Sequence, residues 1–270
     1  MIASQRFFRQ IAGFAAAAAA CIGVLALVGW ANGIETLTGV LPSLSTLKPN
    51  TALCLIACGL ALICIAVRPK DRIAVIAARV LAAGALLLAL LSLAEVVFGW
   101  NLGIDQALFV DLGDPVHAGR MGANTGAALA LVATAVLTVG SDTDIVVFRA
   151  QLLTVGAAII TLFSLVGYVY SAAYLYQVVT ATPMAINTAV ALSLLCAAVL
   201  WVKPDRGMMK AIHRADGAGL TMRRLIPAAI VVPVGIGWLR LLGERAGLYD
   251  ATYGVSLSTL SAIAIFVLLI

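Results

Sequence analysis

A short polar motif, Asn followed by Thr, opens an apolar segment at three places in the chain, and Ser-Thr replaces it at a fourth. The copies of this Asn-Thr motif are Asn50-Thr51, Asn124-Thr125, Asn187-Thr188 and Ser258-Thr259. Upstream of each copy lies a Gly followed by a large aromatic residue, namely Gly29-Trp30, Gly99-Trp100, Gly167-Tyr168 and Gly237-Trp238. These glycines are spaced by 70, 68 and 70 residues. A period of this kind indicates an internal repeat.

Each repeat contains two apolar segments of about the length that crosses a bilayer. Hydrophobic residues make up 63% of the chain and charged residues 11%, whereas a soluble domain is about half apolar and a quarter charged. A spanning helix needs roughly 20 apolar residues. We therefore predict an all-α integral membrane protein in which eight transmembrane helices form four two-helix repeats. The predicted spans are 11–31, 50–67, 73–99, 124–140, 146–170, 187–202, 225–242 and 255–270.

The basic residues are distributed unequally between the two sets of loops. If the N-terminus is cytoplasmic, the cytoplasmic segments and the adjoining helix ends hold 13 of the 17 Lys and Arg residues. The four on the outer side are Lys48, Arg120, Arg240 and Arg245. This positive-inside pattern predicts that both termini are cytoplasmic. It also accounts for the net charge of +5 without a nucleic-acid partner.

The sequence predicts no catalytic residue, no cofactor and no metal ligand. The HExxH, GxSxG and Walker patterns are absent. The five cysteines all lie in predicted spans, which argues against a disulfide framework. Cys54 and Cys58 share one helix face and could hold Cu(I), but helix packing is the interpretation we favour because membrane helices use small residues for close contact.

Two roles are open for the Asn-Thr motif at the outer helix ends. Side-chain oxygens of Asn, Thr and Ser can cap the free N–H groups of a helix start, and unsatisfied N–H groups are costly in a membrane. We therefore expect a helix-cap role at all four copies. The other hypothesis is that several partly positive helix N-termini converge on an anionic ligand.

A second candidate site is a polar rim at the outer ends of the helices. Glu95 lies one helical turn inside its predicted span, and ionisable groups in spans are functional candidates. We predict that Glu95 faces Arg240 across an aromatic pocket walled by Trp30, Trp100 and Trp238. The complete set of candidate ligand-binding residues is Trp30, Glu35, Glu95, Trp100, Asp105, Trp238, Arg240 and Glu244. The alternatives are solvated acidic residues and an interfacial aromatic belt.

The segments Arg-Arg-Leu-Ile-Pro-Ala-Ala at 223–229 and Gly-Trp-Leu-Arg-Leu-Leu-Gly-Glu-Arg-Ala-Gly-Leu-Tyr-Asp at 237–250 resemble the N-terminal multi-pass region of bacterial membrane sensor proteins. The Asn-Thr-Ala segments at 50 and 187 fit the same family. In those proteins this region precedes cytoplasmic PAS, histidine kinase or diguanylate cyclase modules. The resemblance implies a multi-pass protein of the bacterial inner membrane. It supplies no binding residue.

We predict that residues 1–270 are the transmembrane input domain of a longer sensor, because the last span has only 16 residues before the sequence stops. A histidine kinase is the expected output module, and a diguanylate cyclase is the alternative. The expected partners are the lipid bilayer, a second copy in a homodimer, an unidentified small ligand and signalling modules in the same chain. The rival interpretations are a small transporter or channel and a purely structural anchor that dimerises a cytoplasmic enzyme.

Overall fold

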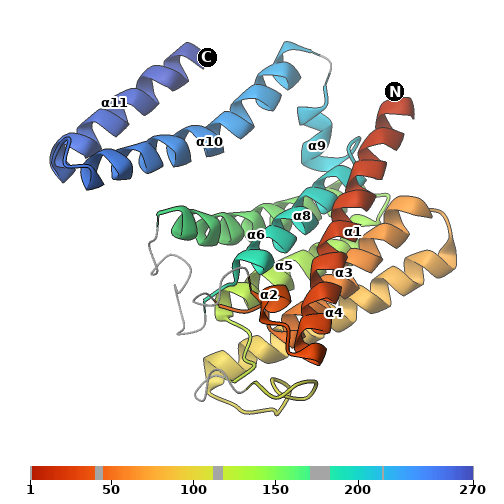
Figure 1. Ribbon diagram of the computed structural model, residues 1–270. Coiled ribbons are helices and arrows are strands. Elements are labelled where there is room, and N and C mark those ends of the chain that lie inside the picture. Colours follow the sequence, from red (N-terminus) through yellow and green to blue (C-terminus); the bar gives the residue numbers. More distant parts are fainter. Residues whose placement is uncertain (1, 40–44, 112–117, 171–182, 215, 270) are drawn as a thin grey trace.

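The computed structural model describes residues 2–39, 45–111, 118–170, 183–214 and 216–269, and all regular structure in these ranges is helical (Figure 1). The helices are α1 (Ile2–Asn32), α2 (Glu35–Thr38), α3 (Pro49–Val67), α4 (Arg72–Phe98), α5 (Ala123–Val139), α6 (Asp144–Tyr170), α8 (Ile186–Val202), α9 (Gly207–Ile212), α10 (Gly217–Arg245) and α11 (Ala251–Leu269).

Five of these helices are long and apolar enough to cross a membrane, and they are α1, α3, α4, α6 and α10. The helices α5 and α8 are apolar but have only 17 residues each, and the apolar part of α11 is also short. At 1.5 Å per residue, 17 residues extend about 25 Å, somewhat less than the hydrocarbon core of a bilayer. The all-α part of the prediction is confirmed for the described residues and the five long apolar helices fit a membrane protein, whereas the eight spans, the four repeats and the cytoplasmic termini stay predictions.

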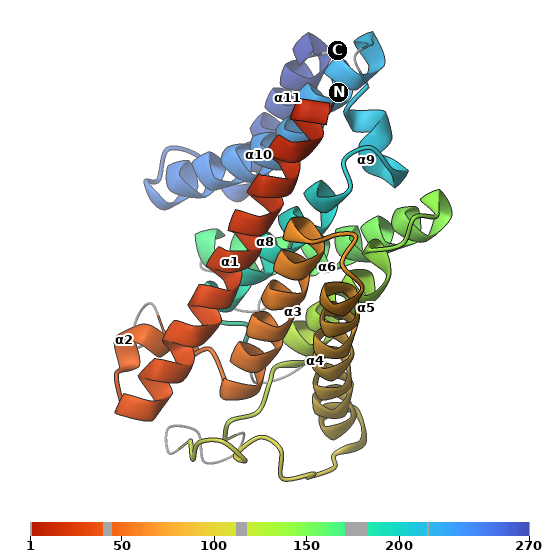
Figure 2. The ribbon, with the colours of Figure 1, turned by 90° about the vertical axis from the view of Figure 1, so that its right-hand side faces the viewer.

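Six helices form a closed ring. Each of α1, α3, α4, α5, α6 and α8 packs on the next in this order, and α8 packs back on α1. The three helices that begin with the Asn-Thr motif, α3, α5 and α8, also contact one another and so form the centre of this arrangement. Figure 2 shows α3 between α1 and α4. The outer end is defined below as the end at which α3, α5 and α8 begin, and the inner end is the opposite one.

The three central helices bury the same positions, counted from the Thr of each motif. A leucine is buried four residues after each Thr, and an alanine ten residues after it. These residues are Leu55, Leu129 and Leu192 in one set and Ala61, Ala135 and Ala198 in the other. The equal spacing places each set at one level along the helices. The centre of the ring is therefore a stack of apolar layers.

Small residues permit the close approach of neighbouring helices in the ring. At Gly59 in α3, an added Cβ would lie 2.7 Å from the Ala16 carbonyl oxygen and 2.8 Å from the Ala20 Cβ in α1. Such contacts are shorter than packed atoms allow, so only glycine fits at this crossing. This is the small-residue packing that membrane helices commonly use.

The last two helices lie outside the ring. The hairpin of α10 and α11 makes its main contacts with the remainder of the described chain through α6 and α9, and α10 buries only Gly219 and Gly243. Tyr170, at the end of α6, donates its hydroxyl to the Val234 carbonyl at 3.0 Å. The chain begins and ends at the same end of the molecule (Figure 1).

The prediction that Ser258 and Thr259 open the last helix is wrong. They lie inside α11, which begins at Ala251, and both hydroxyls bond the Val255 carbonyl, at 2.8 and 2.9 Å. The physical reason is a different start signal, since Asp250 Oδ1 accepts the Tyr253 N–H at 2.7 Å and caps a helix that begins at Ala251, seven residues before Ser258.

Candidate functional site

Five charged residues form a cluster at the outer end of the ring, and this outer polar cluster consists of Lys48, Glu95, Asp105, Asp111 and Arg120. Lys48 Nζ lies 2.5 Å from Asp111 Oδ2, and Arg120 Nε donates to Asp105 Oδ2 at 3.1 Å. Lys48 precedes α3, Glu95 is in α4, and the other three are in the segment between α4 and α5. The cluster thus joins the first helix pair of the ring to the second.

Glu95 is the most buried member of the outer polar cluster. Its side chain has no exposed surface, its Oε1 accepts the Leu102 N–H at 2.7 Å, and the Asp105 carboxyl and the Arg120 guanidinium interact with it. Glu95 Oε2 and Asp105 Oδ1 have no hydrogen-bond partner. Two carboxyls, each with one oxygen without a partner, therefore lie near a guanidinium that pairs with Asp105 alone, an arrangement that can bind a proton or another small cation.

The predicted pairing of Glu95 with Arg240 is wrong. Arg240 lies in α10, where its guanidinium is 3.6 Å from Glu244 and its carbonyl accepts the Tyr249 hydroxyl at 3.0 Å. The main contacts of α10 in the described chain are with α6, α9 and α11, and Arg240 pairs with Glu244 of its own helix rather than with Glu95. Arg120, in the loop after α4, instead pairs with Asp105 at 3.1 Å and interacts electrostatically with Glu95.

The three tryptophans do not wall a common pocket. The Trp30 indole N–H donates to the Leu47 carbonyl at 2.8 Å, and its ring stacks on Phe109 at a centroid distance of 6.4 Å. Trp100 is 53% exposed and stacks on Phe98 at 4.9 Å. Trp238 is exposed on α10, away from both.

The remaining candidate of the predicted rim, Glu35, is exposed at the first residue of α2, as the solvated alternative expects. The other seven predicted residues are divided between three places. Arg120 binds Asp105 and the Trp100 carbonyl, with Nη2 at 3.4 Å from that carbonyl, and it interacts electrostatically with Glu95. Trp238, Arg240 and Glu244 share α10, and Trp30 joins the loop before α3.

The Asn-Thr motif does not supply helix caps. The cap positions of α3, α5 and α8 are Lys48, Gly122 and Ala185, none of which makes a side-chain cap bond. Asn and Thr occupy the second and third helical positions instead. Asn50 donates to the Ile104 carbonyl at 3.1 Å and Asn187 to the Thr38 carbonyl at 2.9 Å. These asparagines therefore join neighbouring helix pairs at the outer end.

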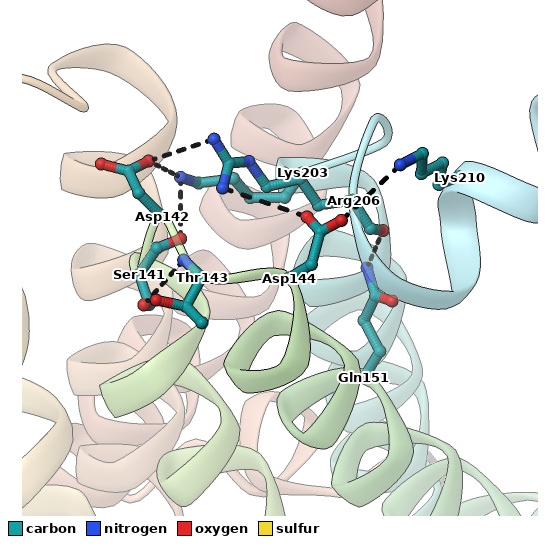
Figure 3. A network of polar contacts seen from close by, with 8 residues as sticks. All are labelled: Ser141, Asp142, Thr143, Asp144, Gln151, Lys203, Arg206 and Lys210. Carbon is teal, nitrogen blue, oxygen red and sulfur yellow. Dashed lines mark hydrogen bonds and ion pairs between the residues drawn. The ribbon is translucent and has the colours of Figure 1, made fainter.

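A second group of polar residues lies at the inner end, and this inner polar network consists of Ser141, Asp142, Asp144, Gln151, Lys203, Arg206 and Lys210 (Figure 3). Lys203 Nζ donates to Asp142 Oδ1 at 3.2 Å and to the Ser141 carbonyl at 3.1 Å. Arg206 lies 3.6 Å from Asp142, and Lys210 lies 3.6 Å from Asp144. The network ties the start of α6 to the chain that follows α8.

Gln151 is the buried centre of this network. Its Oε1 accepts the N–H groups of Met208 and Met209 at 2.6 and 3.4 Å, and its Nε2 donates to the Arg206 carbonyl at 3.2 Å. One fully buried side chain of α6 thus holds the first turn of α9. The hydrogen bond and the charge of Lys203, with the charge of Arg206, lower the pKa of the exposed Asp142 carboxyl below its ordinary value.

Sequence reasoning used the basic residues of 203–224 only as a sign of topology and so missed the inner polar network. The available signal was complementary charge, since Asp142 and Asp144 lie at the start of α6 while Lys203, Arg206 and Lys210 follow α8. His213, at the end of α9, makes a further contact with the ring of helices. Its ring packs edge-on against Phe8 of α1 at a centroid distance of 4.3 Å.

No protein-family model, curated protein or solved structure matches the chain.

Proposed function

We propose that this chain is the membrane-embedded input domain of a bacterial inner-membrane sensor, with both ends cytoplasmic and a histidine kinase as its output module. A signal that reaches the outer end or the lipid would alter the packing of the ring. The last helix would pass that change to the signalling module. A diguanylate cyclase in place of the kinase is the alternative output.

The observation that carries this proposal is the connection between the ring and the terminal hairpin. Gln151 and the ion pairs of the inner polar network hold α9 on α6, and α9 leads directly into α10. The hairpin itself is loosely held, because the contacts between α10 and the ring are few and lie mainly at α6. A displacement of α6 or α8 is therefore transmitted through a few polar contacts to the last two helices.

The centre of the ring favours a sensor over a channel or transporter. Below the three motif threonines the central helices present Leu, Cys, Val and Ile side chains, all buried. A transport path lined by helices carries polar or charged groups near the middle of the membrane. The central layers of the described ring offer an ion no such group.

The exposed surface of α10 and α11 supports the homodimer that forms part of this proposal. Large apolar side chains such as Ile226, Val231, Leu239 and Leu260 are exposed on this hairpin. In a bilayer, small and apolar faces of this kind pack on other helices as well as on lipid. A second copy of the chain against this hairpin would set the two output modules side by side.

The test is output from the full-length protein in membranes. We expect Gln151→Leu and Arg206→Gln each to change basal output several-fold at equal protein level, since both variants loosen α9 from α6. The matched control is Gln10→Leu, an exposed glutamine of α1, which should leave output unchanged. Incorporation of phosphate into histidine identifies a kinase, and formation of a cyclic dinucleotide identifies the alternative. Unchanged output in both network variants would reject the proposed route.

A further inference from the structure

Three buried polar atoms, near the outer end of α4 and in the loop after it, lack hydrogen-bond partners. They are Ser92 Oγ, Glu95 Oε2 and Asp105 Oδ1, and the described residues contain one other such side-chain atom, Arg240 Nε. Ser92 and Glu95 are 1 and 0% exposed, and Asp105 is 8% exposed. Because residues three apart lie on one face of a helix, Ser92 and Glu95 are on the same side of α4. Buried polar atoms without partners are rare in folded proteins, so this group indicates a bound species.

The two carboxyls are in contact, and each has one oxygen that is already occupied. Glu95 Oε1 accepts the Leu102 N–H at 2.7 Å, and Asp105 Oδ2 accepts the Arg120 Nε–H at 3.1 Å. The Glu95 and Asp105 side chains also lie within hydrogen-bonding reach of each other. The contact is therefore left to Oε2 and Oδ1, the two oxygens without partners. Two ionised carboxylates have no hydrogen to share, so this contact lacks one proton.

The charges of the outer polar cluster leave one negative charge without a partner. Lys48 pairs with Asp111 and Arg120 pairs with Asp105, whereas Glu95 forms no ion pair with the described residues. With every group ionised, three carboxylates stand against two cations. An uncompensated charge at a buried site is costly. One proton on the carboxyl pair removes this charge, whereas a water molecule would donate to both oxygens and leave the charge in place.

The helices packed on α4 bring no other charged group to Glu95. These helices are α3 and α5, and neither contains a charged residue. The titratable side chains of α3 are cysteines, and the one that bonds α4 is Cys54, whose Sγ lies 3.6 Å from the Ala85 carbonyl. Ala85 is ten residues before Glu95, which is about 15 Å along the helix. Among the described residues, charge thus acts on Glu95 from the loop after α4.

The set of free oxygens fits a proton better than a metal cation. A proton bound between two groups needs two oxygens, which the two carboxyls provide. Cations that bind oxygen ligands take about six of them, whereas Ser92, Glu95 and Asp105 offer three atoms without partners. The described residues also contain no group of three or more acidic, histidine or cysteine side chains that could hold a metal ion.

We propose that Glu95 and Asp105 bind one proton between them, which enters from the outer side through the loop after α4. This loop is the cover of the site, and in it Leu102 is 44% exposed and the Arg120 side chain 25% exposed. The proton adds to one carboxylate as an O–H group, which donates to the other carboxylate. Loss of the proton leaves two like charges in contact, and their repulsion loosens the loop from α4. As a stimulus this proton rests on the sensor function proposed above, whereas its binding does not.

Infrared spectroscopy of the purified protein in detergent detects the proton. A protonated carboxyl has a C=O stretching band that ionised carboxylates lack, and we expect this band to persist above about pH 6, where ordinary carboxyls are ionised. Glu95→Gln and Asp105→Asn should each remove the band, because the remaining carboxyl then has the Arg120 guanidinium to itself. Glu35→Gln is the matched control, since Glu35 is exposed at the first residue of α2, and it should keep the band.

The unfolding temperature provides a second measurement. A folded protein that holds a proton which the unfolded chain has released becomes less stable as the pH rises. The unfolding temperature of the wild type, taken relative to that of Glu95→Gln, should therefore fall by a few degrees between about pH 5 and pH 8. The Glu35→Gln variant should follow the wild type over this range.

The proposal is overturned if the wild type lacks the band above about pH 6 or if the band survives both substitutions. It is also overturned if sodium in place of choline, at constant pH and ionic strength, stabilises the wild type but not Glu95→Gln, because the site then holds a metal cation. If Glu95→Gln does not fold, Asp105→Asn and the wild type decide. Output of the full-length protein is measured separately. An absent band with output that still responds to Gln151→Leu rejects the proton and leaves the sensor function, whereas a band with output independent of external pH rejects the proton as the stimulus.

Discussion

Lys48 and Asp111, which are 63 residues apart in the chain, meet at 2.5 Å with side chains that are only 11 and 7% exposed. Asp111 Oδ2 also accepts the Gly119 N–H at 3.0 Å. Lys48 sits at the cap position of α3, and Asp111 follows α4. This ion pair therefore connects the start of a central helix to the outer loop of the next helix pair.

Removal of the Lys48 charge should be strongly destabilising. Breaking one side of a buried ion pair leaves the other charge without compensation and costs about 3–5 kcal/mol. We expect Lys48→Met to lower the free energy of unfolding by about 3 kcal/mol, measured by denaturant titration in detergent. Arg68→Met is the control, since Arg68 is 72% exposed and lies 3.9 Å from Asp71; its effect should stay within about 0.5 kcal/mol. Equal effects of the two variants would contradict this account.

Two glycines provide a test of ring packing. An added methyl group at Gly59 would press on the backbone of α1, whereas at Gly84 in α4 nothing lies within 4 Å. We expect Gly59→Ala to destabilise the protein by about 1–3 kcal/mol through overpacking. Gly84→Ala should be neutral or stabilising by up to about 1 kcal/mol because alanine is the better helix former. Thermal unfolding of both variants under one condition measures the difference, and a neutral Gly59→Ala would show that α1 and α3 are not closely packed.

Part of the fold follows from local sequence signals. The Asn-Thr motif marks the start of α3, α5 and α8 to within two residues, and the apolar segments mark all eight long or short apolar helices. The fourth copy misled the prediction because Thr259 has the right spacing from Gly237 but not the right local context. Asp250 provides the stronger start signal, and helix boundaries follow the capping group rather than the period.

The candidate site was predicted less well because membrane depth does not determine contacts. Glu95 and Asp105 were both expected at the outer rim, and they do meet there. Arg240 was predicted to face Glu95, but the basic residue near both carboxyls is Arg120 of the loop after α4, which pairs with Asp105. A choice between two basic residues at equal depth requires the order of helices around the ring, which the sequence pattern does not contain.

The inner polar network should make stability depend on pH through Asp142. Its pKa is lowered by Lys203 and Arg206 in the folded state, so the ionised carboxylate stabilises the fold above its ordinary pKa of 3.8. That contribution is lost as the pH falls through the lowered folded-state pKa. The difference in unfolding temperature between wild type and Asp142→Asn should therefore be largest near neutral pH and should shrink below about pH 4.

The control variant for this comparison is Asp205→Asn, because Asp205 is exposed and forms no ion pair with the described residues. Its difference from wild type should stay small across the same pH range. A difference for Asp142→Asn that grows toward acid would mean that the carboxyl is destabilising in the folded protein, contrary to the geometry of Figure 3.

The orientation in the membrane can be tested with exposed positions at the two ends of the ring. The excess of basic residues in 1–10, 68–72 and 203–224 predicts that the inner end is cytoplasmic. In a variant without the five native cysteines, Asn101→Cys should react with an impermeant maleimide in intact cells, or in spheroplasts if an outer membrane is present. Asp205→Cys should react only after the inner membrane is permeabilised.

A cysteine at a third position, Leu248, tests separately whether the terminal hairpin crosses the bilayer. Leu248 is 76% exposed in the turn between α10 and α11. If this hairpin crosses the bilayer, as the proposed relay through the last helix requires, Leu248→Cys should be labelled from outside like Asn101→Cys. Labelling of Leu248→Cys only after permeabilisation would place the whole hairpin on the cytoplasmic side, and the ring alone would then be the membrane domain. Labelling of Asp205→Cys but not Asn101→Cys in intact cells would invert the predicted topology.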